Sequence, residues 1–279
     1  MTLTRFSKNN PEEILTFFDK NGFVIISDIF EHTVLDDFKI ETSAIIRAHL
    51  DKAGLVDTYS SDSIFDEAMT DLENTDHKYI ASIYDTIFQA PSFFRIIGEK
   101  PLVDGVRLLM RDPNTPLYGF TNRCRIDPPR DERRTYGWHQ EVFYTVPKGN
   151  YIQSWAPLIR DTTVGNGTIR VAVGSHKEGI AKQSWNEIEG RATQILVDNN
   201  VVDKYEQVSV EMEVGELLLF SGFLAHQSGN NTSDEHRYSL VGMYHDVSKL
   251  EFETPSLSFD YRGMTPEDYF KSKFGGSSL

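Results

Sequence analysis

The stretch Trp138-His139-Gln140-Glu141-Val142-Phe143-Tyr144 decides how this chain is interpreted, because it combines metal-ligand residues with an aromatic segment. In a β-strand, residues two apart point to the same side, so His139 and Glu141 are predicted to reach one metal ion while Gln140 points away. A third ligand, His226, would come from a different strand. Two imidazoles and one carboxylate on one face of a metal leave the other face open, which suits non-heme Fe(II) and O2.

The segment around His226 adds a strand and a candidate anion-binding group. Residues 217–225 read Leu-Leu-Leu-Phe-Ser-Gly-Phe-Leu-Ala, which predicts an apolar strand and a break at small residues just before His226. Residues 237–244 predict another strand, with Arg237 and Ser239 on the same face. Arginine grips a carboxylate with a planar fork, and a serine hydroxyl can add a further donor.

Four blocks of the chain together resemble the phytanoyl-CoA dioxygenase-like group of Fe(II)/2-oxoglutarate oxygenases. They are Asn-Gly-Phe-Val-Ile-Ile-Ser-Asp-Ile-Phe at 21–30, Trp-His-Gln-Glu at 138–141, Gly-Thr-Ile-Arg-Val-Ala-Val-Gly-Ser-His at 167–176, and the segment from His226 to Arg237. Their order and spacing extend from about residue 8 to about residue 247. The resemblance implies a double-stranded β-helix core, of the jelly-roll or cupin-like kind, with its metal at the open mouth.

The same resemblance implies a ligand set and a reaction. His139, Glu141 and His226 would hold Fe(II), and 2-oxoglutarate would chelate the metal. Arg237, assisted by Ser239, would bind the distal carboxylate of this cosubstrate. With O2, 2-oxoglutarate would be oxidised to succinate and CO2 while a C–H bond of a small-molecule substrate is hydroxylated. Desaturation or cyclisation would use the same ligands.

Glu141 departs from the family pattern, which usually has Asp at this position. The extra methylene requires either a more distant backbone or a folded-back carboxylate. Glutamate still ligates iron in some related oxygenases, so the ligand set stands. Halogenation is disfavoured, because halogenases of this superfamily have a small residue here that makes room for halide.

Two other functions fit parts of the pattern. His139, Glu141 and His226 could hold zinc and a metal-bound water in a hydrolase, although such an enzyme needs no carboxylate clamp at Arg237. A catalytically silent metal- or ligand-binding protein on the same fold is the other alternative. Turnover of 2-oxoglutarate to succinate with Fe(II) would separate all three.

Composition limits the partners of this chain. Its 279 residues carry a formal net charge of -14, which disfavours a nucleic-acid partner. No apolar run approaches the roughly 20 residues that span a bilayer, and the N-terminus lacks a secretory apolar core. The only cysteine, Cys124, is predicted to be a structural thiol. These features predict a cytoplasmic protein. The family resemblance, not the composition, implies a small-molecule substrate.

The order of elements predicts one domain over 1–279, mainly β with flanking helices. We expect a helical part over about 1–100, a jelly-roll core over about 102–247 and a C-terminal extension to 279. Capping and apolar spacing predict helices over about 11–21, 33–50 and 79–89, with others following Pro91 and starting near Thr265. Strands are predicted at 151–155, 168–173 and 209–214.

Several other polar residues leave alternatives open. The Arg130–Arg134 segment is either a surface loop or a lid for an anionic substrate. One of four residues near the site is a candidate cosubstrate contact: Asn122, Arg123, Arg125 or Ser154. Four histidines are predicted to lie outside the metal site: His77, His176, His236 and His245. Residues 164–167 are predicted to form a turn, not a dinucleotide-binding loop.

Overall fold

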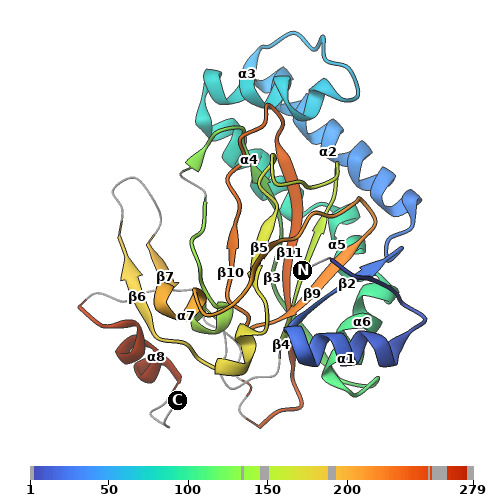
Figure 1. The fold of residues 1–279 in the computed structure, drawn as a ribbon. Helices are drawn as coiled ribbons and strands as arrows, with labels where there is room; N and C mark the ends of the chain where they lie inside the picture. Colours follow the sequence, from blue (N-terminus) through green and yellow to red (C-terminus); the bar gives the residue numbers. More distant parts are fainter. Residues whose placement is uncertain are drawn as a thin grey trace.

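The computed structural model describes residues 3–132, 135–144, 151–187, 193–250, 252 and 263–274. Helices occupy most of the chain up to residue 110, and strands dominate afterwards (Figure 1). The α-helices are α1 (Pro11–Asn21), α2 (His32–Ala53), α3 (Glu67–Thr75), α4 (His77–Phe88), α5 (Pro91–Ile97), α6 (Lys100–Met110), α7 (Asn199–Val202) and α8 (Pro266–Phe274). Short 3-10 helices are η1 (Ser63–Phe65), η3 (Glu141–Tyr144) and η4 (Ser175–Glu178).

The strands of the described residues form three sheets. They are β1 (Arg5–Ser7), β2 (Phe23–Ser27), β3 (Leu117–Asp127), β4 (Tyr151–Pro157), β5 (Ile169–Ala172), β6 (Gln183–Asn186), β7 (Gln194–Val197), β8 (Gln207–Ser209), β9 (Leu217–Ser221), β10 (His226–Ser228) and β11 (Arg237–Asp246). The main sheet has the order β1-β2-β9-β4-β11-β3, a smaller sheet has the order β10-β5-β8, and β6 pairs with β7.

Side-chain alternation along the main sheet creates two apolar layers. On β2, Val24 and Ile26 belong to the cluster shared with the helices, while Phe23 and Ile25 pack towards the smaller sheet. Successive residues of a strand point to opposite faces, so a sheet covered on both sides reads as a continuous apolar run. One face of the main sheet therefore supports the helices, and the other is the inner face.

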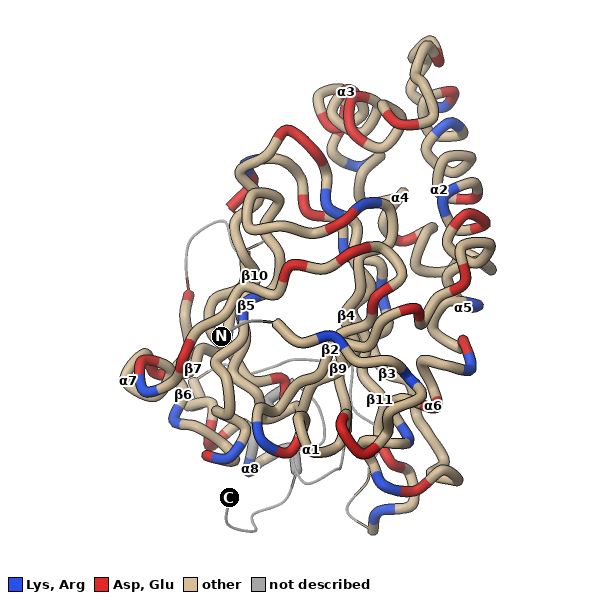
Figure 2. Tube along the Cα trace, turned by 45° about the vertical axis from the view of Figure 1, so that its right-hand side comes forward, with Lys and Arg blue, Asp and Glu red and all other residues tan. Residues whose placement is uncertain are grey.

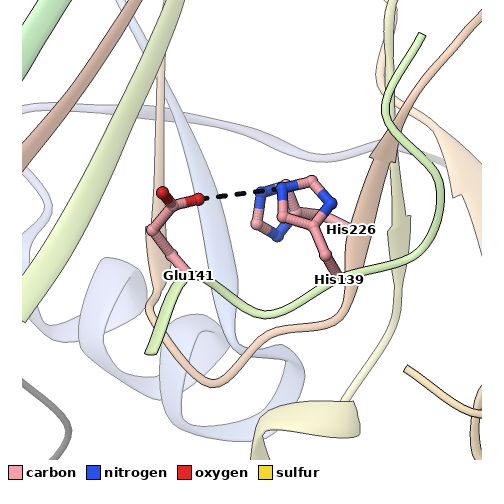
Figure 3. Close-up of side chains that lie close together, drawn as sticks. All are labelled: His139, Glu141 and His226. Carbon is pink, nitrogen blue, oxygen red and sulfur yellow. Dashed lines mark ion pairs between the residues drawn. The ribbon is translucent and has the colours of Figure 1, made fainter. Parts of the chain in front are cut away.

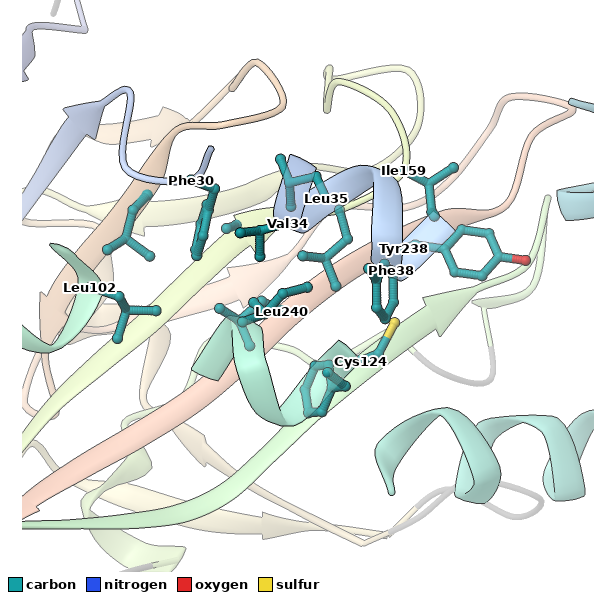
Figure 4. Close-up of a cluster of buried hydrophobic side chains, with 14 of the residues drawn as sticks. Phe30, Val34, Leu35, Phe38, Leu102, Cys124, Ile159, Tyr238 and Leu240 are labelled. Carbon is teal, nitrogen blue, oxygen red and sulfur yellow. The ribbon is translucent and has the colours of Figure 1, made fainter. Parts of the chain in front are cut away.

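The helix-side layer is the larger core. Figure 4 shows Phe38 of α2, Leu240 of β11 and Cys124 of β3 within one packed cluster. Cys124 is 1% exposed, and burial raises the pKa of its thiol well above the usual value. The prediction that this cysteine is structural agrees with its position in the core.

Several helix predictions are confirmed. Pro11 begins α1, and Gly22 ends it with a positive φ of 82°, a conformation that favours glycine. Helix α2 covers the predicted 33–50 segment, and α8 begins at Pro266, where the Thr265 hydroxyl accepts a bond from the Asp268 amide. The Asn10 side chain accepts no bond from a backbone amide of α1; its Nδ2 instead donates to Glu13 Oε2 at 3.5 Å.

Two expectations of the sequence are wrong. The change to strands was placed near residue 102, but α6 occupies Lys100–Met110 and β3 begins only at Leu117. The strand expected at 209–214 is reduced to β8, which ends at Ser209, and a single bridge from Met212 to Thr162. The chain is thus a mixed helical and β protein rather than a mainly β one.

Charge is spread over the outside of the molecule. Figure 2 shows acidic residues on α3 and on several loops rather than on one continuous face. Asp66, just before α3, forms a partly buried ion pair with Arg160 (2.7 Å). Among the helices of the described residues, none has the length and apolarity needed to cross a bilayer.

Candidate metal centre

His139, Glu141 and His226 lie close together, as Figure 3 shows. Each offers one ligand atom, and these atoms all lie within 4.8 Å of one another. His139 Nε2 and Glu141 Oε2 are 3.7 Å apart, and the two imidazole centroids are 4.2 Å apart. The structure therefore brings these three side chains together, as the sequence predicts.

Backbone pairing and carbonyl contacts fix both imidazoles. His139 and His226 exchange two backbone hydrogen bonds, of 2.9 and 3.0 Å. The Nδ1 of His139 bonds the Gly137 carbonyl at 2.7 Å, and the Nδ1 of His226 bonds the Leu224 carbonyl at 2.9 Å. Because a carbonyl only accepts, Nδ1 carries the proton in both neutral rings and Nε2 keeps its lone pair for a metal.

Glu141 reaches the site by a different route from the one predicted. His139 forms an isolated bridge, and Glu141 already belongs to the 3-10 helix η3. The strand rule therefore gave the correct neighbours with the wrong backbone geometry. Gln140 points away as expected, since its amide bonds the carbonyls of Gly179 and Phe223 at 2.9 and 2.6 Å.

Burial controls the charge of the three side chains in the absence of a metal. It lowers the pKa of His139 well below the usual value, with the neighbouring His226 contributing, and lowers the pKa of His226 to about 4. Burial also raises the pKa of Glu141 to about 7, against the opposing charge of Arg123. Uncharged imidazoles are the form that binds metals.

A second polar group lies farther along the inner face. Arg237 and Ser239 are 2% and 0% exposed, and lie on the same face of β11 as predicted. Sequence reasoning missed Asp127 on β3, whose carboxylate accepts a 2.6 Å bond from Arg237 Nη2. Arg125 bonds the same carboxylate through Nε, at 2.9 Å to each oxygen. The signal available was the Arg-x-Asp spacing, which places Arg125 and Asp127 on one face.

Electrostatics keep this group ionised despite its burial. Burial raises the pKa of Asp127, but the two guanidinium groups outweigh it and hold the pKa below the usual range. Within the described part of the chain, Arg237 Nε and Ser239 Oγ are buried without a hydrogen-bond partner. Buried donors normally have partners, so these atoms suit a ligand.

An aromatic group lines the other end of the inner face. The ring of His245 stacks on Tyr151 (4.9 Å between centroids) and lies about 6 Å from Tyr118 (6.3 Å), Phe120 (6.3 Å) and Phe252 (6.0 Å). His245 lies one residue before the end of β11 and is 0% exposed. Of the aromatic segment after Glu141, the side chains of Phe143 and Tyr144 lie outside the described residues.

The remaining candidates occupy varied positions. Asn122 and Ser154 are buried beside Gly242, whereas Arg123 is exposed and bonds only the Thr121 carbonyl (3.3 Å) among the contacts of the described residues. Arg130 forms an exposed ion pair with Asp234 (2.6 Å), while Arg133 and Arg134 lie outside the described residues.

The other histidines and the glycine-rich segment agree with their predicted placement. His77 begins α4, His176 lies in η4, and the backbone N–H of His236 bonds Asp66 at 2.7 Å, away from the metal-site cluster. Residues 164–167 form a turn in which the Asn166 side chain accepts from the Thr163 amide at 2.8 Å.

Comparison with known proteins places this site in a family context. A curated relative, the 1-deoxypentalenic acid 11-beta-hydroxylase of Streptomyces exfoliatus, is 26% identical over 240 residues, covering 81% of this chain and 76% of the relative. The crystal structure of EctD from S. alaskensis with 2-oxoglutarate and 5-hydroxyectoine has a TM-score of 0.57 at 19% identity, covering 86% of this chain and 77% of EctD. The epimerase SnoN in complex with Fe3+, alpha ketoglutarate and nogalamycin RO has a TM-score of 0.59 at 14% identity, covering 92% and 99%.

These structures share the fold of this chain, and they carry iron or its keto-acid partner. Residues 18–239 match one family profile. This span is most of the chain, and it includes the three clustered side chains and Arg237. The chain therefore belongs to the phytanoyl-CoA dioxygenase (PhyH) family.

Proposed function

We propose that this chain hydroxylates an unactivated C–H bond of a small-molecule metabolite. As a family member with the histidine–carboxylate–histidine cluster, it is an Fe(II)- and 2-oxoglutarate-dependent oxygenase. The observation that carries the proposal is this cluster, whose three ligand atoms lie within 4.8 Å of one another (Figure 3).

The cluster fits iron by the chemistry of its donors. Two neutral imidazoles and one carboxylate on one side of an ion are the set preferred by non-heme Fe(II) oxygenases. We propose His139, Glu141 and His226 as the metal ligands and as the catalytic centre. Iron with 2-oxoglutarate would supply the oxidising power, while the carbonyls of Gly137 and Leu224 keep the imidazoles in the required tautomer.

Arg237 and Ser239 fit the distal carboxylate of 2-oxoglutarate. Both are buried on the inner face and offer donors without partners among the described residues. A carboxylate there would satisfy the Arg237 Nε and the Ser239 Oγ together. Because the pair is rigidly placed on β11, it would also orient the keto acid towards the clustered ligands.

The sheets support a finer statement of the fold. We propose that the main sheet and the smaller sheet β10-β5-β8 form a double-stranded β-helix within one domain spanning 1–279. Residues from both sheets share one apolar layer, including Trp155 of β4 and Val171 of β5. His226 begins β10, which places a metal ligand at the edge of this layer.

The substrate is proposed to be a small molecule with an apolar part. The aromatic group around His245 supplies apolar walls on the inner face, and the buried amide nitrogen of Gln153 has no partner within the described residues. Small ligands are typically held by apolar walls with a few polar groups that fix orientation. Matched proteins bind 5-hydroxyectoine and nogalamycin RO, which are small molecules.

The experiment is a substrate-free turnover assay, because enzymes of this class decarboxylate 2-oxoglutarate slowly without substrate. Purified protein with Fe(II), O2 and 2-oxoglutarate should form succinate, and Glu141→Ala should not. Retained succinate formation in Glu141→Ala would refute the ligand assignment. Absence of succinate in the wild type, with no 2-oxoglutarate binding to the Fe(II) protein, would favour a catalytically silent protein.

A further inference from the structure

Four polar side chains form a square on the inner face where β3 pairs with β11. The antiparallel register places Arg237 opposite Asp127 and Ser239 opposite Arg125. Because residues two apart on a strand share a face, all four side chains point to the same side of the sheet. The sequence separation between Arg237 and Asp127 is 110 residues, so only the fold brings them together.

Asp127 is the centre of this square. Its carboxylate accepts hydrogen bonds from Arg237 Nη2 at 2.6 Å and from Arg125 Nε at 2.9 Å, and Arg125 Nη2 lies 2.8 Å from Asp127 Oδ1. The Asn231 side chain also holds the backbone carbonyl of Asp127, at 3.0 Å. Two guanidinium groups are thereby held beside one another by a single carboxylate.

The charge balance of the square leaves room for one more anion. Two arginines and one aspartate carry a net charge of +1, and Arg237 and Asp127 are 2% and 7% exposed. Uncompensated charge is costly at such depth. One further carboxylate would neutralise the square and give partners to the Arg237 Nε and the Ser239 Oγ.

We propose that Asp127 is a positioning residue for 2-oxoglutarate, which holds Arg125 and Arg237 as a fixed pair and so selects a keto acid with a distal carboxylate. This inference rests on the proposed function. It adds Asp127 to the cosubstrate site and places Arg125, one of the candidates from the sequence, beside Arg237. Without Asp127, the long Arg237 side chain would lose its anchor and the square would carry a charge of +2.

The test measures binding of two keto acids to the Fe(II) protein under anoxic conditions. 2-Oxoglutarate has a distal carboxylate, and 2-oxovalerate has the same chain length without one. We expect Asp127→Asn to weaken 2-oxoglutarate binding by about 10- to 100-fold, the range for a lost hydrogen bond to a charged group. Binding of 2-oxovalerate and of Fe(II) should change little, so the preference between the two keto acids should shrink.

Glu216→Gln is the matched control. Glu216 is another buried carboxylate paired with an arginine, Arg5 (2.6 Å), but Arg5 belongs to β1 at the opposite edge of the main sheet from β3. This control should lose stability without changing the keto-acid preference. A purely structural role for Asp127 would weaken both keto acids equally, and that result would overturn the inference.

A second variant keeps the inference testable if Asp127→Asn does not fold. Asp127→Glu keeps the charge but moves the carboxylate by one methylene, so it should fold and still reduce the preference for 2-oxoglutarate. An unchanged preference in the folded variants would overturn the role of Asp127. Failure of the wild type itself to bind 2-oxoglutarate would instead overturn the proposed function.

Discussion

Shortening Glu141 to the aspartate that is usual in this family should damage iron binding in this chain. Ligand atoms about 2.1 Å from a metal and at right angles to one another lie about 3 Å apart. Glu141 Oε2 is already 3.7 Å from His139 Nε2, so a shift of about 0.7 Å would bring the two atoms to the separation of metal ligands. Removing one methylene withdraws the oxygen by about 1.5 Å, which puts it out of reach.

The backbone at residue 141 cannot easily move towards the metal to compensate for the shorter side chain. Glu141 begins η3, and Val142 beside it is fully buried in an apolar cluster with Phe120 and Tyr151. Moving this segment towards the metal would pull Val142 out of its packing. Even loss of a residue that only supports a metal ligand costs about 10- to 100-fold in metal affinity, so we expect at least about a 100-fold loss for Glu141→Asp.

Anoxic titration of the metal-free protein with Fe(II), in competition with a chelator, measures this effect directly. Glu141→Ala sets the affinity of the two imidazoles alone, and Glu141→Asp should lie closer to it than to the wild type. Thermal unfolding checks that both variants are folded. If Glu141→Asp binds Fe(II) as tightly as the wild type, η3 moves freely and the geometric argument is refuted.

Three further predictions concern the cosubstrate, the packing and the pH response. Arg237→Ala should weaken 2-oxoglutarate binding by about 2–5 kcal/mol, or roughly 30- to 5,000-fold, while Fe(II) titration stays near normal; an unchanged 2-oxoglutarate titration would rule out the clamp. Gly222→Ala places a methyl group against the ring of Tyr151 and should cost about 1–3 kcal/mol in the free energy of unfolding. Gly165→Ala is the control: its added Cβ would meet only the Thr163 hydroxyl oxygen, at 3.6 Å, so this variant should unfold in denaturant like the wild type. Burial lowers the pKa of His245 to about 4, so the contribution of this histidine to stability is complete above about pH 6.5 and is lost as the pH falls towards 4. When the free energy of unfolding is measured across this pH window, His245→Asn should remove up to about 3 kcal/mol of its pH dependence. An unchanged pH dependence in this variant would contradict the prediction.

Local signals in the sequence were enough where neighbours along the chain determine the structure. Pro11 and Gly22 delimit α1, and apolar strands such as β9 and β11 follow from their composition. Helix α6 was missed although its buried residues, Leu102, Val106 and Leu109, recur with helical spacing. Gly105 within that run allows close packing, since an added Cβ would lie 3.2 Å from Leu219 Cδ1.

The metal cluster was predictable for a different reason. Histidine and carboxylate side chains are rare on an inner face unless they bind something, so His139, Glu141 and His226 could be identified by residue type and order. Their backbone could not be predicted, because η3 depends on packing around Val142 rather than on local spacing. The position of His245 also depends on tertiary packing, because the rings around it come from separate segments.

Asp127 could not be assigned from the sequence, because its role depends on strand register. A slip of one residue between β3 and β11 would leave Arg237 facing an apolar residue, since Ile126 pairs with Tyr238 in the helix-side core. An unpaired charge at that depth costs several kcal/mol, whereas a slip in an apolar sheet would cost far less. The Asp127–Arg237 pair should therefore stabilise the register of the two strands as well as orient the cosubstrate. On this argument, the pairing of β3 with β11 and the proposed site for 2-oxoglutarate use the same buried charges.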